Sequence, residues 1–313
     1  MSDKTVHEDL SLPFRRRQAS ILSPLRYPGA KRRLSSYIAE TLRLNSLRPK
    51  LLVEPFAGGL SVALQLLNDN MVDMIAIGEK DPLVASFWKV VFKESEWLID
   101  ELSKVPVTVE QWDYFKKTPF RTDRQRALAC IFLNRTSFSG IIAPGAGPIG
   151  GRSQTSDYKI DCRFNVETLA KRIRQAAALS KNVLFVDQAD WQETILKVKA
   201  LEYKRNEVFF YLDPPFFNKA EDLYTHYFDN MSHRALHNAL MKLKHPWLLS
   251  YDKADSIIEM YSHNGDGPKH IDTLYSVGSS GSRPKTQQEV IITNVSILPK
   301  ETRIWRSDEE WKK

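Results

Sequence analysis

Short apolar runs alternate with amphipathic segments along the first third of the chain. The spacing predicts a helix over residues 31–44 and a short buried strand over residues 51–53. A Gly-Gly turn follows that strand, and the pattern then predicts a helix over residues 61–68 and a second strand over residues 74–77. Strand, glycine turn, helix and strand in this order are typical of a parallel α/β fold.

The composition of the chain changes near Glu94. From there to about Ala178 the chain is predicted to be helical and is rich in Arg, Lys and aromatic residues, with a Gly- and Pro-rich loop at residues 143–151. Strand patterns resume afterwards, at residues 183–186, 208–212, 247–250 and 290–292. We therefore expect an α/β protein with a Rossmann-like sheet and an inserted, mainly helical segment. The expected boundaries are a tail at 1–20, a sheet-bearing domain at 21–93 and 181–299, the inserted segment at 94–180, and a charged tail at 300–313.

The overall composition is that of a soluble globular protein. Hydrophobic residues make up 42% of the chain, and the mean hydropathy is −0.38. No apolar run approaches the roughly 20 residues that a membrane-spanning helix requires. Residues 1–20 are polar and lack the apolar core of a signal peptide, so we expect a cytoplasmic protein with no membrane partner.

Cysteine and histidine usage gives no sign of a metal site or a disulfide framework. Cys130 and Cys162 form no CxxC pair, which suits a reducing compartment, and Cys130 is expected in the core because its neighbours are apolar. His226, His233 and His237 are expected at surface positions of a helix. No metal is therefore predicted.

The charge balance favours a polyanionic partner. The chain has 45 Lys and Arg residues against 38 Asp and Glu residues, a formal net charge of +7. A basic surface gains affinity for nucleic acid by releasing counterions from it, although many basic proteins of this size have other partners.

The sequence Asp213-Pro214-Pro215-Phe216 directly follows the apolar run at 208–212. Each proline fixes φ and lacks an N–H, so this strand end is a stiff turn. It holds a carboxylate, neighbouring carbonyls and an aromatic ring together. The oxygens suit the hydrogens of a flat amino group and the ring suits stacking on its base. A turn that only ends a strand is the alternative.

Two features of the first half of the chain suit a nucleoside-containing ligand. A Gly-Gly turn at 58–59 after a strand lets a ligand approach the main chain closely, and the motif is not the GxGxxG of pyrophosphate binders. Glu79 ends the second strand, where an acid commonly accepts hydrogen bonds from ribose hydroxyls. Asp81 is a second candidate for that role, and a solvated acid at the end of a strand is the alternative.

Four motifs in a fixed order support a family resemblance. They are residues 25–31 (LRYPGAK), 54–59 (EPFAGG), 134–140 (NRTSFSG) and 213–216 (DPPF). Over roughly residues 24–295 this arrangement resembles the Dam-type, or D12-class, DNA adenine-N6 methyltransferases. The resemblance implies a DNA methyltransferase that uses S-adenosyl-L-methionine (SAM), with the sheet-bearing domain as the catalytic and SAM-binding part and residues 94–180 as the target-recognition segment.

The resemblance implies that Tyr27, Lys31, Glu79, Asp190 and Asp213 bind the cofactor. Tyr27 replaces the family's usual aromatic residue, and Lys31 would form an ion pair with the carboxylate at the amino-acid end of SAM. Asp190 matches an acid that contacts the adenine amino group of the cofactor. For Asp190, the nearby Asp187 is a rival, and for Lys31 a plain basic surface is the alternative.

DNA contact is implied for Arg135, Ser137, Phe138, Arg163 and Arg283. The first three belong to the motif at 134–140, which offers charge for phosphate, a ring for stacking and small residues for close approach; a turn that ends a helix is the alternative. Arg163 belongs to the basic inserted segment, and Arg283 to a loop that resembles the family's late basic loop.

For catalysis, the resemblance implies base flipping, because the amino group of adenine cannot be reached inside the duplex. Asp213 and a carbonyl of the Pro214-Pro215 turn would accept the amino hydrogens, and Phe216 would stack on the base; the family more often has Tyr at the last position. Double-stranded DNA is the expected partner, together with a restriction endonuclease, and the oligomeric state is left open. Cytosine-N4 methylation of DNA, adenine-N6 methylation of RNA and DNA binding without catalysis are the alternatives.

Overall fold

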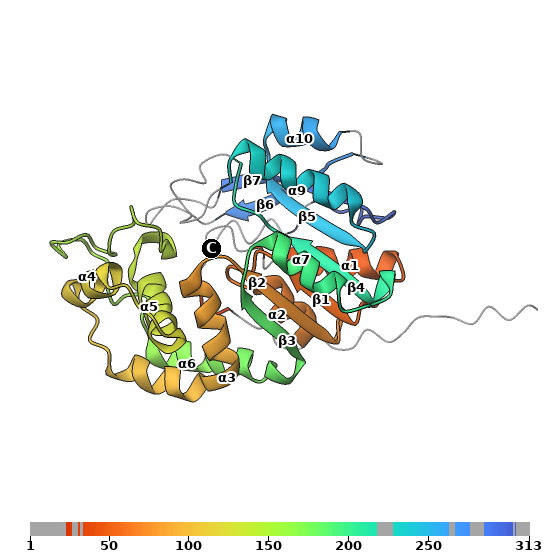
Figure 1. Ribbon diagram of the computed structural model, residues 1–313. Helices are drawn as coiled ribbons and strands as arrows, with labels where there is room; N and C mark the ends of the chain where they lie inside the picture. Colours follow the sequence, from red (N-terminus) through yellow and green to blue (C-terminus); the bar gives the residue numbers. More distant parts are fainter. Residues whose placement is uncertain are drawn as a thin grey trace, which may run out of the picture.

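The computed structural model describes residues 23–26, 31, 34–217, 228–262, 267–275, 285–302 and 304 of the 313-residue chain (Figure 1). Its α-helices are α1 (Leu34–Leu44), α2 (Ser61–Asn68), α3 (Pro82–Lys104), α4 (Val109–Lys117), α5 (Asp123–Thr136), α6 (Val166–Ala177), α7 (Trp191–Lys199), α9 (Asn230–Lys242) and α10 (Asp255–Tyr261). Its 3-10 helices are η1 (Phe138–Gly140), η2 (Ser180–Asn182) and η3 (Arg205–Glu207). Its strands are β1 (Leu51–Glu54), β2 (Met74–Glu79), β3 (Val183–Gln188), β4 (Val208–Leu212), β5 (Trp247–Asp252), β6 (Lys269–Tyr275) and β7 (Lys285–Thr293).

The described strands form one seven-stranded sheet in the order β3-β2-β1-β4-β5-β7-β6. The pairs from β3 to β5 are parallel, and β7 pairs antiparallel with both β5 and β6. The predicted α/β, Rossmann-like fold is confirmed. Because β1 to β5 run in the same direction, the residues that follow them meet at one edge of the sheet, where α/β proteins bind their ligands.

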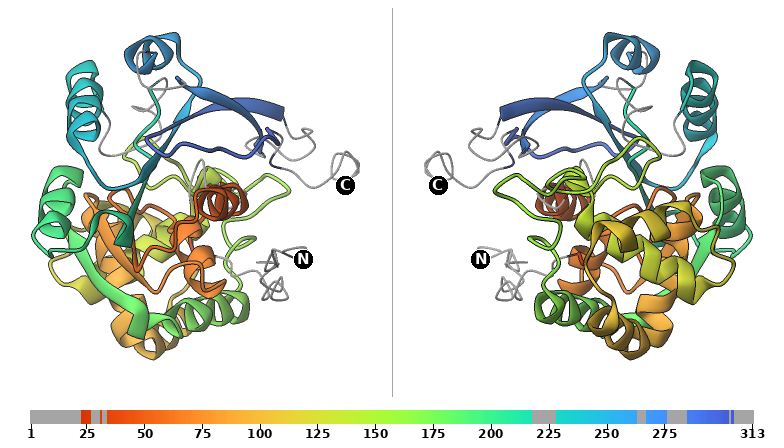
Figure 2. Two further views of the ribbon diagram at one scale, coloured as in Figure 1. Left: turned by 90° about the vertical axis from the view of Figure 1, so that its right-hand side faces the viewer. Right: turned by 90° about the vertical axis from the view of Figure 1, so that its left-hand side faces the viewer.

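Both faces of the sheet are covered by helices, which explains the nearly continuous apolar runs of its strands. Side chains alternate between the faces: Leu52 and Phe209 join the core formed with α1, α2 and α3, whereas Val53 and Phe210 join the core formed with α7, α9 and α10. Figure 2 shows the helices on the two sides of the sheet.

The predicted inserted segment shares its core with the sheet. In Figure 1, α4, α5 and α6 gather around α3 at one end of the molecule. Phe132 of α5 packs against Phe115 and Phe164, at ring-centroid distances of 4.7 and 5.5 Å. The predicted boundary near Glu94 falls inside α3, at a residue with non-helical φ and ψ of −143° and 40°. The domain boundaries stay a prediction.

Two elements differ from those predicted. The first described helix begins at Leu34 rather than at Lys31, whose carbonyl accepts a hydrogen bond from the Leu34 N–H at 2.8 Å. Strand β6 was not predicted. It lies at the edge of the sheet, and four of its seven residues are polar, so its apolar pattern is too weak to identify it.

Candidate functional site

The carboxylate of Asp213 is fixed at the carboxyl end of β4 by a chain of hydroxyl groups. Ser250 Oγ, on the neighbouring strand β5, donates to Asp213 Oδ1 at 2.8 Å. Ser250 Oγ also lies 3.0 Å from the hydroxyl oxygen of Tyr211. Because Ser250 already donates its one hydroxyl proton to Asp213, the Tyr211 hydroxyl is the donor in this second bond. Tyr211 and Ser250 are buried, while a quarter of the Asp213 side chain is exposed. One oxygen of the Asp213 carboxylate is therefore fixed by buried hydroxyl groups of the sheet, while part of the side chain remains accessible to solvent.

Lys31 lies between two carboxylates at this edge. Its ammonium is 3.3 Å from Asp213 Oδ1 and 3.0 Å from Oε1 of Glu289, on β7, and it sits over the ring of Phe216 at 5.2 Å. The side chains of Lys31 and Glu289 are buried. Burial raises the pKa of Asp213 to about 6. The positive charge of Lys31 opposes this rise, and the negative charge of Glu289 adds to it.

Glu79, at the end of β2, holds the glycine turn. Its two carboxylate oxygens accept hydrogen bonds from the N–H groups of Gly58, at 2.8 Å, and Asp81, at 2.9 Å. The carbonyl of Gly58 accepts from the indole N–H of Trp88 at 2.9 Å, and Gly58 has a φ of 43°, which favours glycine. Glu79 is buried, and this burial raises its pKa to about 7.

Glu54 adds a further buried acid to the edge, at the end of β1. Its Oε1 accepts a hydrogen bond from the N–H of Ala63, in the first turn of α2, at 2.6 Å. Burial, together with the negative charge of Asp213, raises the pKa of Glu54 well above its usual range. The carboxyl edge of the sheet therefore carries acids at the ends of β1 and β2, directly after β4 and on β7, and Lys31 pairs with two of them, Asp213 and Glu289. Such an edge suits a ligand with positive charge and hydroxyl groups.

Comparison with known proteins agrees with this geometry. The model of the D12 class N6 adenine-specific DNA methyltransferase family matches residues 27–277. The chain belongs to this family. It is also similar to the type II methyltransferase M.MjaIII of Methanocaldococcus jannaschii, with 26% identity over 213 residues, which is 61% of this chain and 68% of that protein. The protein is therefore a DNA methyltransferase, an enzyme class that needs a methyl donor.

In this D12-class methyltransferase, Asp190 lies beside Glu79. The N–H of Ala189 donates to the carbonyl of Glu79 at 3.0 Å. Asp190 caps α7 by accepting from the N–H of Gln192 at 3.1 Å, and it pairs with Lys80 at 3.2 Å. The rival candidate, Asp187, lies on β3 and pairs with Lys197. The capping contact explains Asp190 without a ligand, so its cofactor role stays a prediction.

The motif at 134–140 is placed where α5 ends, against the segment that leads to Lys31. The Asn134 side chain accepts from the N–H of Arg26 at 2.7 Å and donates to the carbonyls of Arg26 and Gly140, at 2.8 and 2.9 Å. Gly140 has a φ of 78°, and a Cβ there would lie 2.2 Å from the Arg26 carbonyl oxygen. Asn134 and Gly140 therefore join the helical segment to the N-terminal motif.

The predicted DNA-contacting residues of this methyltransferase differ in exposure. Phe138 is 55% exposed and Arg163 is exposed, so both can reach a macromolecule. Ser137 is fully buried and lies 2.9 Å from the indole N–H of Trp112, which donates to it. Arg135 is 6% exposed, and its guanidinium donates to the carbonyl of Pro24. The burial of Ser137 and Arg135 favours a supporting role over direct contact with DNA.

Two of the predicted site residues, Tyr27 and Arg283, lie outside the described residues, as does His226. The surface position predicted for His233 is wrong. It is 1% exposed, and its Nδ1 lies 2.7 Å from the hydroxyl of Tyr251. Burial lowers the pKa of His233 to about 4. Its ring packs against Phe217, with the centroids 4.9 Å apart, so it supports the residue that follows the turn at 213–216.

Ser250, Glu289 and Glu54 were not predicted as site residues. Glu54 stands in the EPFAGG motif at the end of a strand, a signal that could have identified it. Ser250 also lies in a predicted strand, but nothing in the sequence aligns it with Asp213. Glu289 lies beside a predicted strand, and only the pairing of β7 with β5 brings it to Lys31.

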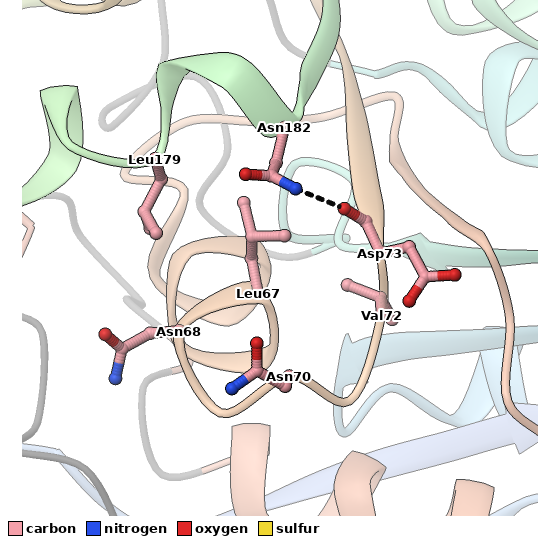
Figure 3. A pocket seen from close by; sticks show the side chains of 7 residues that line it. All are labelled: Leu67, Asn68, Asn70, Val72, Asp73, Leu179 and Asn182. Atoms are coloured by element: carbon pink, nitrogen blue, oxygen red, sulfur yellow. Dashed lines mark hydrogen bonds between the residues drawn. The ribbon is translucent and has the colours of Figure 1, made fainter.

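A separate pocket, of about 250 Å³, lies at the amino ends of the strands, away from the carboxyl edge that carries Asp213 (Figure 3). It lies between the turn that joins α2 to β2 and the residues that precede β3, and Asn182 donates to the carbonyl of Asp73 across it at 2.8 Å. Its lining is mainly carboxamides and aliphatic side chains. Because it lies at the amino ends of β2 and β3, it is not part of the site around Asp213.

Within the described ranges, no group of three or more His, Cys, Asp or Glu side chains is arranged to hold a metal ion. Over these ranges, no helix has the length and apolar character needed to cross a membrane.

Proposed function

We propose that this chain transfers a methyl group from SAM to the N6 atom of adenine in double-stranded DNA. The observation that carries the proposal is the fixed carboxylate of Asp213. It stands at the end of β4 in a Pro-Pro-Phe turn, held by Ser250 and paired with Lys31. Family membership and the similarity to a type II methyltransferase support the same reaction.

The carboxyl edge suits SAM by its charge and its hydrogen-bond acceptors. When bound, SAM supplies an electrophilic methyl group on a positively charged sulfur. Among the described residues, Asp213 and Glu289 both pair with the single ammonium of Lys31, so these three side chains leave a net negative charge that suits this cation. The carboxylate of Glu79 accepts one main-chain N–H at each oxygen and has roughly two acceptor positions left for ribose hydroxyls. Tyr27, Lys31 and Asp190 complete the proposed cofactor-binding residues.

Asp213 is proposed to act on the amino group of a flipped adenine. Its carboxylate and a main-chain carbonyl of the Pro214-Pro215 turn accept the two amino hydrogens. This turns the nitrogen lone pair away from the ring and toward the methyl group. The new N–C bond forms as the C–S bond breaks, and the bond electrons remain on the sulfur. The surplus amino proton leaves through Asp213 to water, so no strong base is required.

Phe216 is proposed to hold the flipped base by stacking. The ammonium of Lys31 lies 5.2 Å from the centroid of its ring, which helps to keep the ring at the edge beside Asp213. Phe in place of the family's more common Tyr keeps the stacking face and lacks the phenol hydroxyl. Positioning of the nitrogen, the methyl group and the carboxylate supplies most of the proposed catalysis.

The expected partners of the reaction follow from the same proposal. Double-stranded DNA is the substrate. A restriction endonuclease that recognises the same site is a proposed partner, in line with the type II methyltransferase to which the chain is similar.

The deciding experiment is single-turnover transfer from labelled SAM to duplex DNA, followed by digestion to nucleosides and their identification by mass. We expect N6-methyladenine from the parent chain and none from Asp213→Ala. Asp100→Ala is the matched control, because Asp100 is exposed on α3 and pairs with Lys104. N4-methylcytosine would overturn the base assignment, and labelled RNA with unlabelled DNA would overturn the substrate.

A further inference from the structure

Four arginines gather around the segment that leads to Lys31. The guanidinium of Arg135 donates to the carbonyl of Pro24, and that of Arg172, on α6, donates to the preceding carbonyl at 3.5 Å. Arg26 follows in the same segment. Burial, and then the positive charges of Arg172, Arg26 and Arg163, lower the pKa of Arg135 to about 9. We call these four residues the arginine cluster.

The arginine cluster lacks a counterion in the part of the chain that the structure describes. Within the described residues, none of its members forms an ion pair with a carboxylate. Other arginines of the same helical segment do pair: Arg124 with Glu94, Arg152 with Asp113 and Arg174 with Glu96. These three paired arginines are exposed, whereas within the described residues the buried Arg135 and the half-buried Arg26 and Arg172 have no carboxylate partner.

Arg135 shows the cost of this arrangement most clearly. Arg135 is 6% exposed, and its Nε finds no hydrogen-bond acceptor among the described residues. A buried charge without a counterion destabilises the fold, and an anion placed against the cluster would offset that cost. Arg163 is exposed and Arg26 and Arg172 are half-buried, so an anion can reach the cluster from solvent.

The position of the cluster limits what the anion can be. Phe138, three residues after Arg135, is 55% exposed, and its neighbours Asn134 and Gly140 lie against the main chain of Arg26. Lys31 follows Arg26 by five residues, a span of at most about 18 Å even when fully extended. A ligand that fills the Asp213 turn and contacts Phe138 would therefore pass the cluster.

We propose that the arginine cluster binds a phosphate of the DNA backbone within a few nucleotides of the target base. Arg163, Arg172 and Arg26 contact the phosphate, and Arg135 lies behind them as a positioning residue that holds the 23–26 segment. Arginine suits this role because its planar fork makes two parallel bonds to phosphate oxygens. The inference rests on the proposed function for the presence of DNA at this edge.

The first test measures DNA affinity against salt concentration. Each lost phosphate contact flattens the slope of log affinity against log salt by roughly 0.9. We expect that change for Arg163→Gln and for Arg172→Gln. Arg174→Gln is the matched control: it lies on the same helix α6 and removes the same charge, but Arg174 is exposed and paired with Glu96 at 2.7 Å. Arg135 is left intact because its buried side chain supports the fold.

The second test uses the two cysteines of the chain. Cys162 is exposed and lies within electrostatic range of Arg26, whereas Cys130 is buried. Burial and the charge of Arg163 lower the pKa of Arg26, and Cys162 opposes them. Alkylation of Cys162 should be slowed by duplex DNA and unchanged by SAM alone, while Cys130 stays unreactive and serves as the internal control. Protection by SAM alone would assign the cluster to the cofactor's carboxylate and overturn the inference.

The outcomes separate this inference from the proposed function. If the parent chain methylates adenine but the Arg163 and Arg172 variants keep the salt slope of Arg174→Gln, the phosphate site is wrong and the methyltransferase proposal stands. If the parent chain forms no N6-methyladenine, the proposed function fails, while protection of Cys162 by DNA would still support an anion site.

Discussion

Two groups of buried charge lie close together in this protein, and they are built in opposite ways. At the carboxyl edge of the sheet, Lys31 is held between two carboxylates, those of Asp213 and Glu289, so this group of described side chains carries an excess of acid. In the arginine cluster, Arg135 and its neighbours are held by main-chain carbonyls, with no carboxylate among the described residues. The first group suits a cationic cofactor and the second an anionic phosphate. The charge that a folded chain leaves unbalanced thus indicates the charge of its ligand.

The comparison predicts that the two groups can be separated by mutation. Changes in the acid-rich group should alter methyl transfer or cofactor binding and leave the salt dependence of DNA binding unchanged. Changes in the arginine cluster should alter that salt dependence first. A variant of either group that moves both measurements equally would break the comparison.

The largest expected effect is that of Asp213→Ala on the rate of methyl transfer. Losing the acceptor of the amino hydrogens should slow single-turnover transfer by about a thousandfold, or roughly 4 kcal/mol. DNA affinity should survive, because it depends mainly on phosphate contacts made elsewhere. Quench-flow transfer and DNA titration on the same preparation test both statements. A rate equal to that of Asp100→Ala would contradict the role of the turn.

Phe216→Ala should slow transfer by less. Stacking of a base on an aromatic ring contributes about 1–3 kcal/mol. Phe216→Tyr keeps the stacking face and should therefore transfer at close to the parent rate. The single-turnover assay distinguishes the two variants. Equal rates for Ala and Tyr, whether fast or slow, would show that the ring does not act by stacking.

Glu79→Ala should weaken SAM binding. The loss of buried ribose hydrogen bonds costs about 1–3 kcal/mol, which is roughly a 5- to 150-fold rise in the dissociation constant. Calorimetry measures the dissociation constant of SAM directly. Thermal unfolding of the variant without ligand shows whether loss of the Glu79 carboxylate has destabilised the glycine turn. Glu96→Ala, an exposed acid on α3, is the control. Unchanged SAM affinity in a folded Glu79→Ala variant would remove Glu79 from the site.

The smallest effects should be opposite shifts in the pH dependence of transfer. The carboxylate form of Asp213 is the one that acts, so the rate should fall as the pH drops through its pKa of about 6. Glu289 raises this pKa and the Ser250 hydrogen bond lowers it. Glu289→Gln should therefore move the fall to lower pH, and Ser250→Ala should move it to higher pH.

Rate–pH profiles of both variants check the signs, with Ser103→Ala, at an exposed helix position, as the control. Shifts in the same direction would show that the two side chains affect the fold rather than the charge of Asp213.

Most of the fold could be predicted from the sequence because its central strands are buried on both faces. Strands such as β1 and β4 read as unbroken apolar runs, and their lengths and glycine turns identify them. The edge strand β6 could not be predicted, because a strand with one covered face and few apolar residues has little pattern. The surface position expected of His233 failed for a related reason: helical spacing does not show which face packs against Tyr251.

The sequence by itself determined the ends of the parallel strands and the residues that follow them. In a parallel sheet those ends share one edge, so Glu79 and Asp213 could be assigned to one site from their order alone. Family membership follows from the same motifs and is confirmed by the match over residues 27–277.

Only the tertiary structure decided which charges are balanced. Ser250 reaches Asp213 across 37 residues of sequence, and Asn134 binds Arg26 across 108. Glu289 meets Lys31 because β7 pairs with β5, and Arg135 is buried because the 23–26 segment covers it. Burial and pairing between distant segments arise only when the chain packs, and they set the pKa values and the uncompensated charge. The sequence therefore identified the residues that could carry the chemistry, and packing decided which of them face a ligand and which support the fold.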